Sequence, residues 1–121
     1  MSAQGPAVLD HFQNPRNVGE LPPPAVTVEV TNPACGDILR LSIHADGGRI
    51  EEVRFKVRGC VASIACGSLL TELVHGKTLE EAERISADEV ISAIGGLPPE
   101  SGHAGLLAED ALKAALKAVR R

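Results

Sequence analysis

The sequence predicts an α+β fold in which a three-stranded antiparallel sheet packs against helices in two layers. In the first half of the chain, apolar residues alternate with polar residues, as they do in strands. After residue 60 the apolar residues follow helical spacing instead. Strands in one block followed by helices in another are typical of α+β domains. With 121 residues, the chain is expected to form one domain, residues 1–121.

Three short runs carry the strand pattern, and they lie at residues 26–30, 39–43 and 53–57. Their period of two means that one face of each strand is buried and the other faces water. Asp46-Gly47-Gly48 separates the second run from the third, and this composition is typical of hairpin turns. An antiparallel sheet of consecutive strands is therefore expected.

The helical part comprises a short N-terminal helix and, after the strands, four further helices. Their expected positions are Pro6–Phe12, about Ala62–His75, two short helices beginning at the capping pairs Thr78/Glu81 and Ser86/Glu89, and about Gly105–Val119. Asn14-Pro15 ends the first of them, because a residue before proline is disfavoured in the helical conformation.

Composition excludes several classes of function. The net charge is −4, the chain has two aromatic residues, and no basic stripe is present, so nucleic acid is not an expected partner. No apolar run approaches the ~20 residues that span a bilayer. Three cysteines without a secretory signal indicate reduced thiols in a cytoplasmic protein. We expect a monomer or a weak dimer.

The segment Cys35-Gly36-Asp37 lies at the entry to the second strand. Residues two apart in extended chain point the same way, so the thiol and the carboxylate can face a common point. Gly36 removes a side chain between them and allows another group to approach. The alternative is that Cys35 is a small buried residue in a turn.

Cys60 ends the third strand directly before the long helix, and His103 lies in a glycine-flanked loop before the last helix. A helix N-terminus favours the thiolate form of cysteine, which is the form that binds metals. The alternatives are a buried cysteine at a strand end and a surface histidine. The other histidines are expected at the surface: His11, His44 and His75.

Cys66 shares a helix face with Leu70 and Leu73, and we interpret it as a small core residue. The alternative is a second thiol near Cys60 at the helix start. The spacing of the three cysteines and His103 matches no compact zinc motif. These groups can meet only through the fold, and the residues alone indicate no more than a candidate Cys/Asp/Cys/His site.

Five stretches of the sequence, spread over nearly the whole chain, add a more specific signal. They read VLDHFQNPRNVG (8–19), NPACGD (32–37), FKVRGCVASIA (55–65), TELV with GKT (71–78), and LPP with His103 and LAEDA (97–111). Together and in this order they resemble the NifU/IscU/SufU-like family of iron–sulfur cluster assembly scaffolds.

The resemblance implies a ligand cluster at one end of a sheet packed with helices. Carried over by position, the ligands are Cys35, Asp37, Cys60 and His103. They would hold iron or a transient [2Fe–2S] cluster, built with sulfur from a cysteine desulfurase and passed to recipient apo-proteins. The implied protein is a scaffold or carrier and not an enzyme.

The chain departs from the family pattern at several positions. Ala104 stands where the pattern has a cysteine after the histidine, and Cys66 replaces a serine. The Leu-Pro-Pro-Val-Lys segment that docks a chaperone in some members reads LPPES here (97–101). Two alternatives therefore stay open, namely a zinc-binding sulfur acceptor and a metal-free interaction module with the scaffold fold.

Overall fold

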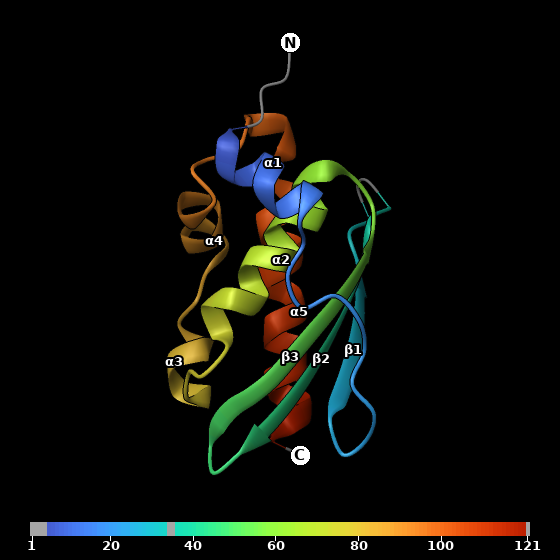
Figure 1. Cartoon of the computed structure of the whole chain (residues 1–121), viewed down its shortest axis with the longest axis vertical. Coiled ribbons are helices and arrows are strands. Elements are labelled where there is room, and N and C mark those ends of the chain that lie inside the picture. Colours follow the sequence, from blue (N-terminus) through green and yellow to red (C-terminus); the bar gives the residue numbers. More distant parts are fainter. Residues whose placement is uncertain (1–4, 34–35, 121) are drawn as a thin grey trace.

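The computed structural model describes residues 5–33 and 36–120 (Figure 1). In chain order its elements are α1 (Pro6–Gln13), β1 (Val26–Thr31), β2 (Ile38–Asp46), β3 (Arg49–Arg58), α2 (Val61–Val74), α3 (Leu79–Glu83), α4 (Ala87–Ala93), η1 (Pro99–Ser101) and α5 (His103–Val119). Apart from the short 3-10 helix η1, which was not predicted, this is the predicted order of strands and helices. No helix in the described part of the chain is both long and apolar enough to cross a membrane.

The strands form one antiparallel sheet in the order β1-β2-β3. Gly47 and Gly48 close the β2–β3 hairpin with φ angles of +62° and +77°, which a two-residue turn of this kind requires. At the opposite end of the hairpin, Ile38 pairs with Arg58. The residues just before β2 and just after β3 therefore lie side by side at one end of the sheet.

Helices α2 and α5 cover one face of the sheet, and α1, α3 and α4 pack against these two helices (Figure 1). Leu39, Leu41 and Ile43 of the central strand are fully buried beneath them. A Cβ atom at Gly67 of α2 would lie 2.8 Å from the Phe55 ring. The absence of a side chain at Gly67 thus lets α2 approach β3 closely.

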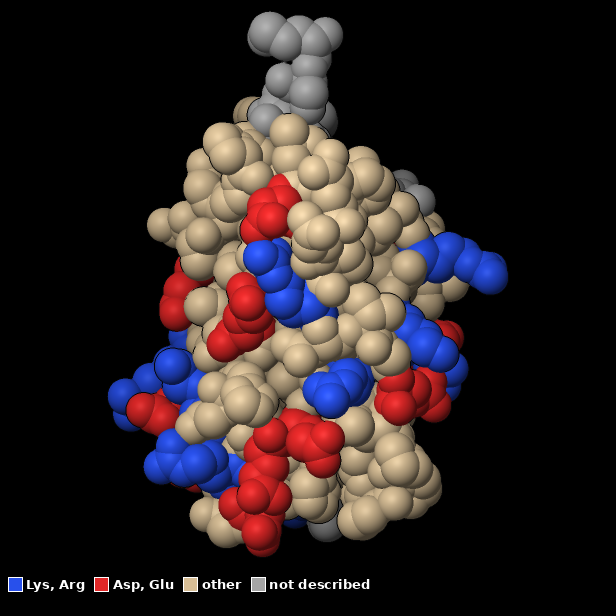
Figure 2. All heavy atoms as spheres, in the orientation of Figure 1, with Lys and Arg blue, Asp and Glu red and all other residues tan. Residues whose placement is uncertain are grey.

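The short helices begin at their predicted caps. Thr78 and Glu81 form a reciprocal capping box, and the Ser86 hydroxyl accepts the Glu89 amide hydrogen. On the face shown in Figure 2, positive and negative side chains are intermixed, and they are sparser toward the upper end.

Two predictions about the N-terminal helix are wrong. His11 is 7% exposed instead of lying at the surface, whereas Leu9 and Phe12 of the expected apolar face are 37% and 38% exposed. The reason is that α1 packs on α2 and turns Val8 and His11 inward. His11 finds a polar partner there, because its Nδ1 lies 2.8 Å from the Ser68 Oγ of α2.

Candidate metal centre

Three of the four ligands expected from the sequence meet beside the N-termini of α2 and α5, which lie toward the upper end of the molecule in Figure 1. One ligand atom each from Asp37, Cys60 and His103 lies within 4.8 Å of the others. The His103 Nε2 is 3.7 Å from both the Cys60 Sγ and the Asp37 Oδ2. Cys35, the fourth candidate, lies outside the described residues.

The end of the sheet and the N-termini of two helices bring these residues together. Asp37 immediately precedes β2, and Cys60 follows β3 as the N-cap of α2. His103 is the first residue of α5, so the prediction that it lies in a loop is wrong. The helix begins two residues earlier than its apolar pattern indicated. Its N-cap is Gly102, which directly follows the 3-10 helix η1.

Gly59 is part of the site although it carries no ligand atom. A Cβ atom at this position would lie 2.5 Å from the Asp37 Cγ and 2.8 Å from both carboxylate oxygens. Only glycine therefore lets the carboxylate lie directly against the backbone that leads to Cys60.

The Oδ2 oxygen of the Asp37 carboxylate lies among several polar groups. Its Oδ2 accepts a hydrogen bond from the Ser63 hydroxyl at 2.5 Å, and lies 3.3 Å from the Cys60 Sγ and 3.4 Å from the Cys60 amide nitrogen. Ser63 is fully buried. Sequence reasoning missed this residue, although its position three residues after Cys60 places both on the same side of the first helical turn.

The electrostatic setting favours anionic ligands. The N-termini of α2 and α5 both lie at the site, and the positive end of a helix dipole stabilises a thiolate or a carboxylate. Asp37 is buried, the His103 side chain is 25% exposed and Cys60 is exposed. The site is thus anchored on its inner side and open to solvent at the thiol.

The donor set suits a soft or borderline transition metal. Thiolate, imidazole and carboxylate are ligands of zinc and iron, whereas magnesium and calcium prefer oxygen ligands alone. The Nε2 of His103 faces the other two groups, and an imidazole nitrogen is a common metal ligand. Three donors leave at least one position of a tetrahedral ion for a further ligand.

Cys66 occupies the core position that its helical phase predicted. It is 0% exposed, and burial, with a smaller contribution from the nearby Cys60, raises the pKa of its thiol to about 12. A thiol with such a pKa stays protonated at neutral pH and is a poor metal ligand. Ala104, next to His103, is also buried, at 1% exposure.

Comparison with known proteins agrees with this arrangement. Residues 4–121 match the family described as the NifU-like N-terminal domain. The chain belongs to this family. The match covers every element that contributes to the site, including the starts of β2, α2 and α5.

Relatives in the family are similar over most of their length. The iron–sulfur cluster assembly scaffold protein IscU 1 of Archaeoglobus fulgidus is 47% identical over 109 residues, which cover 90% of this chain and 71% of that protein. The scaffold protein IscU of Azotobacter vinelandii is 47% identical, with coverage of 91% and 88%.

A solved structure supports the fold. The crystal structure of a protein described as a scaffold for the SUF system, from Fervidobacterium islandicum AW-1, superposes with a TM-score of 0.74. The alignment covers 93% of this chain and 95% of that one, at 24% identity. At this identity the likeness concerns the architecture alone, and it matches the predicted three-stranded sheet packed with helices.

Proposed function

We propose that this chain is an iron–sulfur cluster assembly scaffold, which holds iron or a transient [2Fe–2S] cluster as cargo at Cys35, Asp37, Cys60 and His103. The observation that carries the proposal is the convergence of Asp37, Cys60 and His103 in a member of the NifU-like family. Scaffold relatives at 47% identity support the same role.

The mixed ligand set suits cargo that has to leave again. Thiolates hold iron–sulfur clusters firmly, whereas carboxylate and imidazole are harder donors that replace a thiolate in few such sites. Ala104 supplies no additional thiolate next to His103. A cluster held here is therefore expected to be labile, which helps transfer to a recipient protein.

The proposed partners are a cysteine desulfurase as the source of sulfur and apo-proteins as recipients. Of the two described cysteines, Cys60 is exposed and Cys66 is buried. Cys60 is therefore the described thiol that can reach a partner. Its thiolate would attack the terminal sulfur of the desulfurase persulfide, forming a persulfide on Cys60 and releasing the desulfurase thiolate.

Anaerobic reconstitution tests the proposal. The chain is incubated with ferrous iron, L-cysteine and a cysteine desulfurase, desalted, and analysed for iron, acid-labile sulfide and visible absorption. Equal amounts of iron and sulfide with charge-transfer absorption, followed by loss of both to an apo-ferredoxin, are expected. A protein that binds only zinc, or no metal at all, contradicts the scaffold role.

A further inference from the structure

We propose that Ser63 is a positioning residue of this site, whose hydroxyl fixes the Asp37 carboxylate as a metal ligand. The inference rests on the proposed function only in requiring that the site takes a metal. The proposed ligands are carboxylate, thiolate and imidazole groups, and Ser63 is not one of them. It acts through Asp37, which its hydroxyl contacts from the first turn of α2.

The geometry of the contact is that of a strong hydrogen bond. An ionised carboxylate only accepts hydrogen bonds, so the Ser63 hydroxyl is the donor, at 2.5 Å from the Asp37 Oδ2. Charge-assisted bonds of this kind are short and stronger than neutral ones. Ser63 is 0% exposed, so water does not compete for the hydroxyl.

The Ser63 contact is the shortest of those named here on the Asp37 Oδ2. The Cys60 thiol and the Cys60 amide nitrogen also lie near this oxygen, at 3.3 Å and 3.4 Å, against 2.5 Å for the Ser63 hydroxyl. Since Ser63 is not one of the proposed ligands, its hydroxyl can orient the carboxylate while Cys60 and His103 bind a metal.

The same hydroxyl also borders the second ligand. The Ser63 Oγ lies 3.4 Å from the Cys60 Sγ, so a single side chain contacts both the carboxylate and the sulfur. Groups that hydrogen-bond metal ligands typically change metal affinity by about 10- to 100-fold when they are removed. We therefore expect Ser63→Ala to weaken metal binding within that range.

The chain offers a matched control. Ser68 is also 0% exposed and lies on the same helix, but its hydroxyl contacts His11 and the Arg16 amide, away from the site. Ser68→Ala therefore removes a buried hydroxyl without touching Asp37. Ser63→Thr retains a hydroxyl at the proposed position and serves as the conservative variant.

The experiment uses Co²⁺ as a spectroscopic probe of the full chain under anaerobic conditions. Affinity is obtained by titration, the ligand field from the visible absorption bands, and folding from circular dichroism. Relative to the natural chain, Ser63→Ala should bind Co²⁺ ~10- to 100-fold more weakly with altered visible bands. Ser68→Ala and Ser63→Thr should keep both the affinity and the spectrum.

The outcomes separate this inference from the proposed function. If the natural chain binds Co²⁺ and folded Ser63→Ala binds it as tightly or more tightly, Ser63 does not position the ligand and the scaffold role stands. Equal losses in Ser63→Ala and Ser68→Ala would show a general effect of destabilisation and would also overturn the inference. A natural chain that binds no Co²⁺ overturns both.

Discussion

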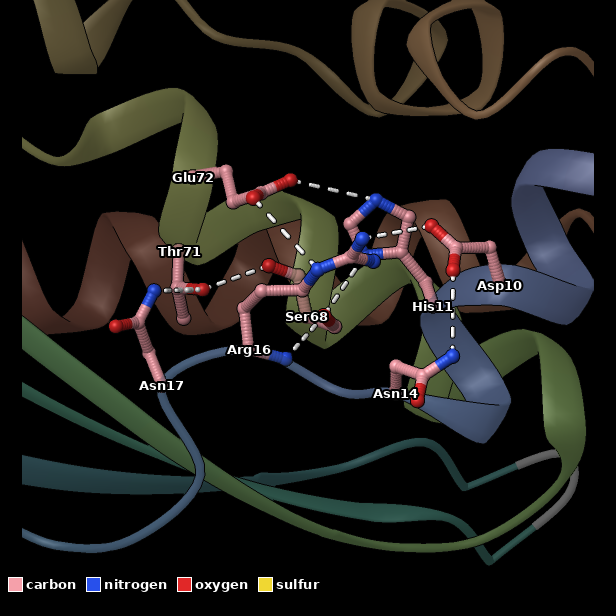
Figure 3. Close-up of polar contacts among 8 residues, drawn as sticks. All are labelled: Asp10, His11, Asn14, Arg16, Asn17, Ser68, Thr71 and Glu72. Carbon is pink, nitrogen blue, oxygen red and sulfur yellow. Dashed lines mark hydrogen bonds and ion pairs between the residues drawn. The ribbon is translucent and has the colours of Figure 1, made fainter.

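Helix α2 contributes one fully buried serine to each of two polar clusters that differ in kind. Each cluster also contains a histidine and at least one carboxylate, and the N-terminal cluster is formed by Asp10, His11, Arg16, Ser68 and Glu72. Ser63 contacts Asp37, which faces His103. Ser68 contacts His11 Nδ1 at 2.8 Å and accepts the Arg16 amide hydrogen at 2.9 Å (Figure 3).

The difference lies in what neutralises the carboxylates. In the N-terminal cluster the Arg16 guanidinium contacts Asp10 at 2.6 Å and Glu72 at 3.8 Å, so the cation is part of the protein (Figure 3). The groups that contact Asp37 include the Ser63 hydroxyl, the Cys60 thiol and amide, and the His103 imidazole. A thiolate and an imidazole can bind a metal ion together with the carboxylate. The first cluster therefore fastens α1 to α2, and the second is suited to accept a cation.

The largest expected effect comes from removing the exposed thiol of the second cluster. Cys60→Ala should lower Co²⁺ or iron affinity by more than the ~10- to 100-fold typical of outer-shell changes, because it deletes a ligand. Metal titration of the folded variant measures this. His11→Gln, which alters the N-terminal cluster only, is the control and should bind metal like the natural chain. Similar losses of metal affinity in Cys60→Ala and His11→Gln would contradict the proposed difference between the two clusters.

A second, smaller effect is expected from Gly59→Ala. The new methyl group would lie 2.5 Å from the Asp37 Cγ and must displace the carboxylate, so metal affinity should fall by roughly the 10- to 100-fold of a misplaced ligand. Gly67→Ala is the matched control, since its methyl group would press on Phe55 at 2.8 Å, away from the site. Both variants should lose about 1–3 kcal/mol from overpacking in urea unfolding. Unchanged metal binding in Gly59→Ala would mean that Asp37 is not a ligand.

The sequence was sufficient to predict which residues of the site meet at the end of the sheet. Alternating strands joined by the turn at residues 46–48 dictate an antiparallel pair, so the start of the second strand must meet the end of the third. That pairing places Asp37 beside Gly59 and Cys60. His103 comes from a distant helix. The residues alone made it a candidate, and its assignment as a ligand beside Asp37 and Cys60 followed from the family resemblance.

Other features depended on tertiary packing that local patterns do not encode. Apolar spacing favoured Leu9 and Phe12 as the buried face of α1, yet docking on α2 buried His11 instead. Buried polar groups are nearly always hydrogen-bonded, so burial of His11 requires a partner for its ring nitrogen. That partner is Ser68, which lies 57 residues away in the sequence. Ser63, by contrast, was accessible to sequence reasoning, because helical periodicity alone relates it to Cys60.

Acid is expected to reduce the free energy of unfolding by a moderate amount through the N-terminal cluster. Burial, aided by the positive charge of Arg16, lowers the pKa of His11, and the weaker influence of Glu72 and Asp10 opposes this. Since the folded state disfavours the protonated imidazole, the stability that His11 contributes is present above the ordinary value of 6.5 and is lost as the pH falls from there through the lowered folded pKa. His11→Gln removes this titration.

Urea unfolding of both chains at about pH 7.5 and about pH 5.5, on either side of the ordinary histidine pKa, tests the point. The natural chain should lose more stability between these values than His11→Gln does, because the other histidines are common to both. An equal loss in the two chains would show that His11 is not the group that responds to acid in this cluster.

The smallest expected effect concerns the third cysteine, which lies on α2 between the two serines. Cys66 is fully buried among apolar side chains and its pKa is raised to about 12, so it should neither bind metal nor react with alkylating agents in the folded chain. Cys66→Ala should leave metal stoichiometry unchanged and cost only about 1 kcal/mol of packing. A short iodoacetamide pulse followed by peptide mass mapping should label Cys60 in native protein and Cys66 only in denaturant. Loss of bound metal from folded Cys66→Ala would instead show that this thiol replaces the ligand missing at Ala104, and the site would then extend into the core of α2.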